Sequence, residues 1–506
     1  MQLRQLIQSF PTQEVEGALD REVTGLAYDS RRVTAGTVFV ALRGQRTDGH
    51  QFINDAIDRG AVAVICERNG FSSARATKIV VSDAREALAR AATAFHGNPS
   101  AKLKVIGVTG TNGKTTVAFM VKALMDAAGI PTGLLGTIRY EIGDRVIPAA
   151  RTTPEALEIQ QMLSQMVRAG CQACVMEVSS HALDQKRTLG VEFDVAIFTN
   201  LTQDHLDYHG TMDGYFAAKM KLFTALQHGV KRGAAVINID DAYGERLRLQ
   251  TEVAVKLTYG LGEAAQLRAT NLRLDRNQTS FQVAIAGQSV SCQLPLIGRY
   301  NIYNALAALG AGLMLNVEVP TLRRALRELS PVPGRLERIT RDEEFSVFVD
   351  YAHTDDALAQ VLETLREVTP GRLLLVFGCG GSRDTGKRAK MGAVAARLAD
   401  ETIITSDNPR REPPAAIAAE IEQGYRAIRE DGYQVELDRQ RAIDAIIERA
   451  GAGDTVLIAG KGHETYQEFE DTVVPFDDRI IAREALDALS VRRRQGGGRR
   501  LDCLLV

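Results

Sequence analysis

VIGVTGTNGKTT, residues 105–116, is an apolar run that ends in a glycine-rich turn, and the helical pattern VAFMVKALMDAAG follows it. This order of strand, glycine loop and helix is typical of nucleotide phosphate sites, because backbone N–H groups of the loop and the helix N-terminus point at the phosphate oxygens. Lys114 can reach the β- and γ-phosphates, and the Thr115 hydroxyl can ligate Mg²⁺. The strict pattern GxxxxGK[ST] is not fully met, since Val108 stands at its first glycine with glycines on either side. The stretch nevertheless predicts a phosphate-binding loop rather than an ordinary glycine turn.

The size and composition are those of an ordinary soluble globular protein. A chain of 506 residues corresponds to roughly three domains of about 150 residues. The formal net charge of −2 gives no electrostatic reason to expect a nucleic acid as partner. We find no run of about 18 apolar residues and no signal-peptide core in the N-terminal MQLRQLIQSFPTQE, so we expect no membrane span and a cytoplasmic protein.

The six cysteines are scattered along the chain, which argues against a disulfide framework. Cys171 and Cys174 form a CxxC pair, but no second Cys or His pair lies nearby at metal-binding spacing. We therefore interpret this pair as buried structural residues.

Strand and helix patterns predict an α/β protein with three domains. The first is small and mixed α/β. The second is a central parallel-sheet domain that carries the phosphate loop and a β-rich insert at residues 252–295, and the third is a Rossmann-like α/β domain. HGNPS (96–100) and SPVPGR (330–335) read as linkers. The expected boundaries are 1–97, 98–333 and 334–490, and residues 491–506 read as a basic, glycine-rich disordered tail.

Acids and histidines follow two of the central strands. Glu177 ends the strand pattern ACVMEV, and the carboxyl ends of strands are where ligands bind in open α/β sheets. The loop TNLTQDHLDYHG (199–210) follows another strand and carries His205, a candidate metal or phosphate contact, and His209, which we interpret as structural. Lys219 lies in a helical pattern and reads, by itself, as a solvated lysine.

Five segments together resemble the Mur ligase family, the ATP-dependent amide-bond ligases of bacterial peptidoglycan precursor synthesis. They are DSRRVTAGTVFVALRGQRTDGHQF (29–52), TGTNGKTT (109–116), MEVSSHALDQKR (176–187), GRYNIYNALAA (298–308) and DYAHTDDAL (350–358). The resemblance runs over about residues 20–480 in the family's order. It implies a first domain for a UDP-sugar, a second for ATP and a third for an amino acid.

Two features resemble the family member that adds the third peptide residue. The N-terminal DSRxVxxGxxFVAxxG pattern is similar to the UDP-binding domain of the third- and fourth-step enzymes, and TSDNPR (405–410) is similar to the amino-acid-selecting motif of the third-step enzyme. The implied reaction joins meso-2,6-diaminopimelate to the D-glutamyl γ-carboxylate of UDP-N-acetylmuramoyl-L-alanyl-D-glutamate through an acyl phosphate, with ATP and Mg²⁺. Arg410 can hold the second carboxylate of diaminopimelate, which lysine lacks. We expect the chain to act as a monomer.

The resemblance assigns roles to residues by position. Catalysis is implied for Lys114, Glu177, His205 and Lys219, and Mg²⁺ ligation for Thr115, Glu177, His205 and, if carbamylated, Lys219. The nucleotide site is implied at Gly110, Thr111, Asn112, Gly113, Lys114, Thr115, Thr116, Asn304, Arg335, Asp350, Tyr351 and His353. The UDP-linked substrate is implied at Ser30, the loop 43–50, Thr152, Thr153, Ser179, Gln185 and Arg187. The amino acid is implied at Arg383, Asp407, Asn408, Pro409, Arg410, Gly460 and Glu464. Asp355 and Ser382 depart from the family pattern, which has proline and aspartate there.

Other interpretations remain open. A sister ligase could add lysine, a dipeptide or a folate glutamate, although DNPR and the UDP-type first domain argue against these. A P-loop ATPase or nucleotide switch would hydrolyse ATP without a carboxylate substrate. A catalytically dead binding module is disfavoured by the intact Lys114, Thr115, Glu177 and His205.

Overall fold

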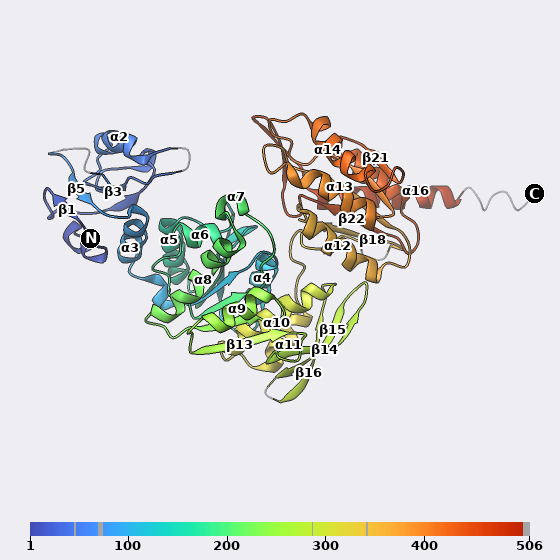
Figure 1. Cartoon of the computed structure of the whole chain (residues 1–506), viewed down its shortest axis with the longest axis horizontal. Coiled ribbons are helices and arrows are strands. Elements are labelled where there is room, and N and C mark those ends of the chain that lie inside the picture. The colour runs from blue at the N-terminus through green and yellow to red at the C-terminus, as the bar shows by residue number, and fades with distance from the viewer. Residues whose placement is uncertain (45–46, 69–73, 286, 341–342, 499–506) are drawn as a thin grey trace, which may run out of the picture. The chain divides into compact units, whose positions relative to one another are not determined.

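The structure is a computed structural model that describes residues 1–44, 47–68, 74–285, 287–340 and 343–498 (Figure 1). Within those residues the strands form sheets of five, eleven and six strands and one two-stranded hairpin. The chain divides into two compact units, each described below by itself. The first unit contains Met1–Ala269, Val283–Ser289 and Tyr303–Ala325, and the second contains Thr270–Gln282, Val290–Ile302 and Leu326–Val506.

The N-terminal sheet has the order β1-β5-β4-β3-β2, and its strands are parallel except for β1. The strands are β1 (Glu14–Glu16), β2 (Gly25–Ala27), β3 (Thr37–Val40), β4 (Ala63–Cys66) and β5 (Thr77–Val80). Alternate residues of β3 and β4 enter two different hydrophobic clusters, so both faces of the sheet are buried. This explains the continuous apolar runs that predicted these strands. The two longer helices of this region are α2 (Ile53–Asp58) and α3 (Ala84–Phe95), which fits the predicted mixed α/β character.

The central sheet has the order β16-β15-β14-β13-β12-β11-β6-β10-β7-β8-β9. The strands β13, β12, β11, β6, β10 and β7 run parallel, and β8 and β9 continue the sheet antiparallel. Their bounds are β6 (Lys104–Thr109), β7 (Thr132–Leu135), β8 (Arg139–Ile142), β9 (Arg145–Pro148), β10 (Ala173–Glu177), β11 (Val195–Phe198), β12 (Ala234–Asn238), β13 (Val255–Gly260), β14 (Leu267–Leu274), β15 (Thr279–Ile285) and β16 (Gln288–Leu294). The predicted β-rich insert corresponds to β13–β16.

Strand β6 lies between β10 and β11, so the loops that follow these three strands meet at one sheet edge. Ligands of open α/β sheets bind at this kind of edge. The helices of this part of the chain are α4 (Lys114–Ala127), α5 (Ala156–Arg168), α6 (Ser180–Asp184), α7 (Leu206–His209), α8 (Met212–His228), α9 (Ala242–Gln250), α10 (Arg299–Met314) and α11 (Val319–Arg327).

The C-terminal sheet has the order β17-β18-β22-β19-β20-β21, and β17 alone among these described strands is antiparallel to its neighbour. The strands are β17 (Glu337–Arg338), β18 (Ser346–Asp350), β19 (Leu373–Phe377), β20 (Glu401–Ile404), β21 (Tyr433–Val435) and β22 (Thr455–Ala459), with the hairpin β23 (Tyr466–Phe469) and β24 (Thr472–Pro475). Alternate residues of β18, β19 and β22 enter two separate hydrophobic clusters. The flanking helices are α12 (Asp355–Val368), α13 (Gly386–Leu398), α14 (Pro414–Arg426), α15 (Arg439–Arg449) and α16 (Asp478–Gly498).

The expected tail at residues 491–506 needs correction at its beginning, because α16 continues to Gly498. Arg492 pairs with Glu448 at 2.7 Å, and Arg493 donates to the carbonyl of Ala450 at 3.1 Å, which holds this last part of the helix. The remaining tail, residues 499–506, lies outside the described residues.

One further expectation, that of buried structural cysteines, is confirmed for the described residues. Cys171 and Cys174 are buried free cysteines. No helix among the described residues is long and apolar enough to cross a membrane.

Candidate active site

The phosphate loop joins β6 to α4 in a shape that needs glycine. Gly110 and Gly113 have φ values of +149° and +85°, and a Cβ at Gly110 would lie 1.9 Å from the Thr199 hydroxyl. Lys114 folds back over the loop, and its Nζ donates to the carbonyl oxygens of Gly110 at 3.0 Å and Thr111 at 2.7 Å. The loop therefore already has the curled backbone of a phosphate cradle.

Asn200, at the end of β11, supports the loop. Its Oδ1 accepts from the Asn112 N–H at 2.9 Å, and its carbonyl accepts from the Thr111 N–H at 2.9 Å. Asn304 on α10 approaches the loop from another direction, since a Cβ on Gly113 would lie 2.5 Å from its Oδ1. The predicted nucleotide contact Asn304 is thus beside the loop.

Glu177, at the end of β10, is 1% exposed and has its carboxylate beside the loop. Oε2 accepts from the Thr115 hydroxyl at 3.0 Å and from the Thr137 hydroxyl at 3.0 Å, while Oε1 accepts from the Thr137 N–H at 2.8 Å. A carboxylate and a hydroxyl at this separation fit Mg²⁺, which prefers oxygen ligands and keeps several waters. No group of three or more His, Cys, Asp or Glu suitable for a metal occurs among the described residues, so such an ion would need oxygens from water and substrate.

Lys219 on α8 is buried, with 1% of its surface exposed, so its interpretation as a solvated lysine is wrong. Its Nζ donates to the carbonyl of Gly110 at 2.7 Å and lies 4.5 Å from the centre of the Tyr215 ring, one helical turn earlier. Burial, with help from the Lys114 charge, holds the pKa of Lys219 well below its usual range. The same Tyr215 hydroxyl meets the Thr111 hydroxyl at 3.2 Å, which ties α8 to the loop.

His205 belongs to a cluster of rings that the sequence alone did not reveal. Its ring centre lies 4.9 Å from that of His181 and 6.1 Å from that of Tyr215, and its backbone is left-handed with φ +53°. Burial lowers the pKa of His205, and the charges of Lys114 and Lys219 act in the same direction. Neutral imidazole is the form that binds metals.

The other two histidines of this cluster have structural contacts. His209 stacks on Tyr215 at 5.1 Å and its Nε2 lies 2.9 Å from the Ser180 hydroxyl, which agrees with its structural interpretation. Burial, then the nearby His205, lowers the pKa of His181 to about 4.

Predicted contacts of the UDP-linked substrate gather next to Glu177. The Thr153 hydroxyl donates to the carbonyl of Glu177 at 2.8 Å and accepts from the Ser179 N–H at 3.0 Å. Thr152 meets the Thr137 hydroxyl at 3.1 Å. Arg187 donates to Gln185 Oε1 through Nη2 at 2.6 Å and to the carbonyl of Thr153 at 3.0 Å.

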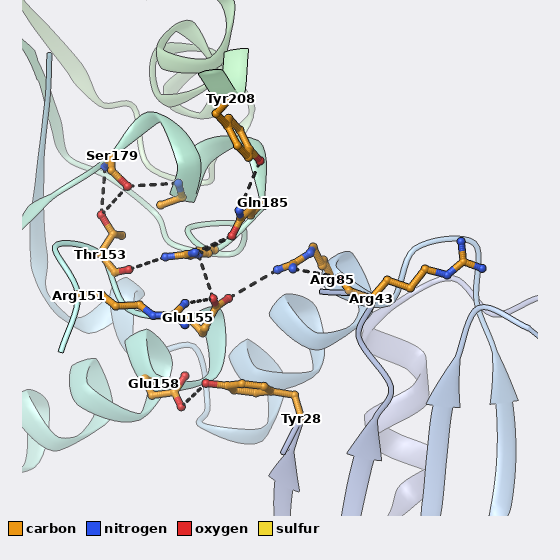
Figure 2. Close-up of polar contacts among 12 residues, drawn as sticks. Tyr28, Arg43, Arg85, Arg151, Thr153, Glu155, Glu158, Ser179, Gln185 and Tyr208 are labelled. Carbon is orange, nitrogen blue, oxygen red and sulfur yellow. Dashed lines mark hydrogen bonds and ion pairs between the residues drawn. The ribbon is translucent and has the colours of Figure 1, made fainter. Parts of the chain in front are cut away.

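Glu155, which the sequence analysis did not single out, holds three arginines around this group (Figure 2). It pairs with Arg187 at 3.2 Å, with Arg85 of α3 at 3.7 Å, and with Arg151. Figure 2 shows Arg85 and Arg151 reaching Glu155 from either side. Burial lowers the pKa of Arg187, Glu155 opposes that effect, and Arg151 and Arg85 add to it. One carboxylate for three guanidinium groups leaves positive charge for an anionic ligand.

Ser30 and the loop 43–50 lie in the N-terminal sheet region. Ser30 is 7% exposed and begins a short 3₁₀ turn at Ser30–Arg32. Within the loop, His50 Nδ1 lies 2.6 Å from Asp48 Oδ1, whereas residues 45 and 46 lie outside the described part. In Figure 2 the side chain of Arg43 points away from Glu155. The backbone carbonyl of Arg43 accepts a hydrogen bond from Arg85 at 3.4 Å.

In the second unit, the DNPR motif follows β20 and meets the loop after β22. Asn408 Nδ2 donates to Glu464 Oε2 at 2.8 Å, and a Cβ on Gly460 would lie 3.6 Å from Asp407 Oδ2. Burial raises the pKa of Glu464, and Lys461 opposes this. Lys461, absent from the predicted set, lies among these residues.

Arg410 has a left-handed backbone, with φ +54°, next to Pro409. Its Nε donates to Glu468 at 2.8 Å and its Nη1 to the carbonyl of Gly381 at 3.0 Å, which orients the guanidinium. Arg383 is exposed, and the structure does not bring it into a hydrogen bond with the DNPR residues that it describes.

The remaining nucleotide-side predictions cluster at the end of β18. The Arg335 guanidinium lies 4.7 Å from the centre of the Tyr351 ring, and His353 Nδ1 donates to the carbonyl of Tyr351 at 2.9 Å. Asp350 accepts from the N–H groups of Leu336 at 2.6 Å and Ala352 at 2.8 Å. Burial raises the pKa of Asp350, and Arg335 opposes it.

The two departures from the family pattern lie at different local structures. Asp355 is the first residue of α12, where a negative charge is favourable beside the helix N-terminus. Ser382 has φ +53°, and its N–H donates to Glu412.

Three family models match the chain in order. They are the Mur ligase family, catalytic domain (residues 22–96), the Mur ligase middle domain (108–312) and the Mur ligase, glutamate ligase domain (334–462).

Similar proteins include UDP-N-acetylmuramoyl-L-alanyl-D-glutamate–2,6-diaminopimelate ligases. That of Syntrophomonas wolfei is 43% identical over 96% of this chain and 99% of its own length. That of Solibacter usitatus is 46% identical over 94% and 95%. A solved structure of an enzyme of that name is 34% identical, with a TM-score of 0.70 over 96% of this chain and 99% of that one. The MurF ligase of Thermotoga maritima in complex with ADP, at 21% identity and a TM-score of 0.60 over 93% and 97%, shares the fold.

Proposed function

The chain belongs to the Mur ligase family, and from this premise we propose that it is the ATP-dependent ligase that joins meso-2,6-diaminopimelate to UDP-N-acetylmuramoyl-L-alanyl-D-glutamate. The observation that carries the proposal is similarity at 43–46% identity over at least 92% of the chain to enzymes with that name. The reaction forms the amide at the D-glutamyl γ-carboxylate during peptidoglycan precursor synthesis. We also propose a bacterial cytoplasmic enzyme that acts as a monomer.

We assign ATP to the loop between β6 and α4. The curled loop and the N-terminus of α4 supply N–H groups to the phosphates, and Lys114 would exchange its two loop carbonyls for phosphate oxygens. Asn304 beside Gly113 supports a nucleotide contact on that side, and we assign the same role to Arg335, Asp350 and His353. Thr115 and Glu177 are the proposed Mg²⁺ ligands, and the ion would supply charge neutralisation at the phosphates.

A second metal position is proposed at His205 and Lys219. An amine reacts with carbon dioxide only when it is neutral, and the lowered pKa of the buried Lys219 favours that form. The carbamate would turn a buried amine into an anionic oxygen ligand. Burial, with help from the charge of Lys114, lowers the pKa of His205, and the neutral imidazole suits metal binding.

The substrate carboxylate would be held by the groups around Glu177. Arg187, Gln185, Thr152, Thr153 and Ser179 are the proposed contacts, with Ser30 and the loop 43–50 on the uridine diphosphate side. One carboxylate oxygen attacks the γ-phosphorus and ADP leaves, which gives an acyl phosphate. Lys114 neutralises charge on the transferring phosphoryl group, and the work of the site is positioning and electrostatic stabilisation.

The amino acid would bind to Asp407, Asn408, Pro409, Arg410, Arg383, Gly460 and Glu464. Its free amine attacks the acyl carbon, loses a proton, and expels phosphate to form the amide. Asp407 and Glu464 suit an ammonium group, whereas Arg410 suits the distal carboxylate. Glu468 accepts from the single N–H of Nε and the Gly381 carbonyl accepts from Nη1, so bidentate pairing would use Nη2 and the second N–H of Nη1.

The test is ATP-dependent phosphate release with UDP-N-acetylmuramoyl-L-alanyl-D-glutamate and Mg²⁺, comparing meso-diaminopimelate, L-lysine and no amino acid. We expect release with diaminopimelate alone. Equal release with lysine would point to a lysine-adding sister enzyme and contradict the role of Arg410. Release without an amino acid would favour an ATPase or nucleotide switch.

A further inference from the structure

Lys461 is a fully buried lysine among the residues proposed to bind the amino acid. Its relative exposure is 0%, and its Nζ donates to Asn408 Oδ1 at 3.0 Å, to Asp407 Oδ1 at 3.4 Å and to Glu464 Oε2 at 3.4 Å. An ammonium group has three N–H donors, so all three have an acceptor among proposed substrate residues. Lys461 also lies 5.7 Å from the centre of the Tyr466 ring.

The contacts of Lys461 extend through Asn408. Asn408 Oδ1 accepts from both Lys461 and the Glu468 N–H, the latter at 3.1 Å, and its Nδ2 donates to Glu464 Oε2 at 2.8 Å. The orientation of the amide is therefore defined by its neighbours on both ends. Glu468 in turn accepts from Arg410, so one hydrogen-bonded chain joins Lys461 to the arginine proposed to select the substrate.

The charge balance gives Lys461 a second role. Two carboxylates, Asp407 and Glu464, share one ammonium, which leaves one negative charge on the group. Burial and the Asp407 charge both favour a proton on Glu464, and Lys461 opposes them. Without Lys461, one of the two buried carboxylates tends to take up a proton. The pair then keeps a single negative charge, and Glu464, whose pKa burial and Asp407 already raise, becomes the neutral member.

We propose that Lys461 is a positioning residue for amino-acid recognition, which orients Asn408 and Glu464 and keeps Glu464 a charged acceptor for the substrate ammonium. The inference rests on the proposed function and deepens its third substrate site. A small misplacement of a substrate-binding side chain can reduce the rate of an enzyme by about 100-fold. We expect an effect of this size when Lys461 is replaced.

The test replaces Lys461 by methionine, which has similar length without charge, and by glutamine, which keeps N–H donors. KM for meso-diaminopimelate, for ATP and for UDP-N-acetylmuramoyl-L-alanyl-D-glutamate is measured by phosphate release. For Lys461→Met we expect KM for diaminopimelate to rise by about 100-fold while the other two KM values stay unchanged. For Lys461→Gln we expect a smaller rise in the same KM only.

Arg388→Met is the matched control. Arg388 is also 0% exposed and pairs with two carboxylates, Glu412 at 2.9 Å and Glu420 at 3.1 Å, but among the described residues it forms no hydrogen bond or ion pair with Asp407, Asn408 or Glu464. Its loss should lower the melting temperature by a similar amount and change KM for diaminopimelate far less.

Three results would overturn the inference. They are an unchanged KM for diaminopimelate in both Lys461 variants, an equal rise of all three KM values, or two unfolded Lys461 variants beside a folded Arg388→Met protein. The last result would make Lys461 a residue of the fold. A wild-type protein without diaminopimelate-dependent phosphate release would instead contradict the proposed function itself.

Discussion

Arg410 illustrates how a single side chain can be prepared for recognition. Its backbone has φ +54°, a conformation that places the residue at a turn beside the β23 strand, and two of its donor nitrogens are occupied by Glu468 and Gly381. The guanidinium is therefore oriented without a substrate, which reduces the entropy lost on binding.

We expect Arg410→Lys to lose selectivity for diaminopimelate. Lysine keeps the charge but cannot form two parallel bonds to a carboxylate while also bonding Glu468. kcat/KM for meso-diaminopimelate should fall by about 100-fold, equivalent to about 3 kcal/mol. Arg411→Lys is the matched control, because Arg411 is 80% exposed and meets only Asp471 at 4.0 Å in the described structure. Equal losses in both variants would contradict the selectivity role of Arg410.

His463 is a second residue whose environment makes a measurable prediction. Its Nδ1 is buried with no hydrogen-bond partner among the described residues, and its ring lies 5.0 Å from that of Tyr351. Burial, followed by the charge of Arg335, lowers the pKa of His463 to about 3. The unfolded state, with a pKa of about 6.5, therefore binds the proton first as the pH falls.

The contribution of neutral His463 to stability is complete above pH ~6.5 and is lost as the pH falls from there toward 3. We expect His463→Phe, which keeps an aromatic ring and does not titrate, to reduce this loss. Thermal unfolding at pH 7 and at pH 5 measures it, and the melting temperature of the wild type should fall more than that of the variant. The titrating carboxylates are the same in the wild type and the variant, so they lower both melting temperatures alike. An equal decrease in the melting temperature of the two proteins would show that His463 does not titrate as described.

At the level of elements, helix α4 has a left-handed glycine at each end with different surroundings. Gly113 has φ +85° and a Cβ there would meet Asn304 Oδ1 at 2.5 Å, whereas Gly129 has φ +76° and nothing within 4 Å. An alanine would introduce backbone strain at both positions. Only at Gly113 would its methyl group also collide with Asn304, a proposed nucleotide contact.

We expect Gly129→Ala to lower the free energy of unfolding by about 1 kcal/mol through strain alone and to leave KM for ATP unchanged. Gly113→Ala should lower stability further and raise KM for ATP, because the new methyl group displaces Asn304 or the loop. Denaturant unfolding and phosphate-release kinetics of both variants separate the two effects. A normal KM for ATP in Gly113→Ala would show that the loop tolerates the side chain.

The predicted strands and helices agree best with the structure where a local sequence pattern defines them. Each of the four clearest central strands, β6, β10, β11 and β12, forms where an apolar run predicted it, since strands of a parallel sheet are buried on both faces. The end of α16 was not predicted, because the three glycines of RRRQGGG have poor helix propensity. Contacts of Arg492 with Glu448 and of Arg493 with Ala450 hold this part of the helix.

At the level of the whole molecule, ion pairs connect the first 97 residues to the central sheet region within the first unit. Lys186 pairs with Asp83 at 2.7 Å and with Glu86 at 2.8 Å, and Arg85 pairs with Glu155. The side chain of Glu155 is 12% exposed and also holds Arg187. The substrate side is thus built by segments that are far apart in sequence.

We expect Glu155→Gln to raise KM for UDP-N-acetylmuramoyl-L-alanyl-D-glutamate by about 10-fold and to leave KM for ATP unchanged, because Arg187 loses a charged partner worth about 1.5 kcal/mol. Glu158→Gln is the matched control on the next turn at the start of α5. It pairs with Tyr28 at 2.8 Å and Arg32 at 3.4 Å, contacts that Figure 2 shows in part. The same rise in both variants would show a general loosening of this region instead.

The sequence by itself determined the α/β class, the phosphate loop and the strands that carry it, because these depend on residue periodicity and on glycine at left-handed positions. Only the tertiary structure decided the partners of Lys219, Glu155 and Lys461. Lys219 contacts the carbonyl of Gly110 across a separation of 109 residues, and Lys461 contacts Asn408 across 53. Such contacts arise when the order of the strands brings distant loops to one edge of a sheet. The local hydrophobic pattern of the sequence does not reveal that order.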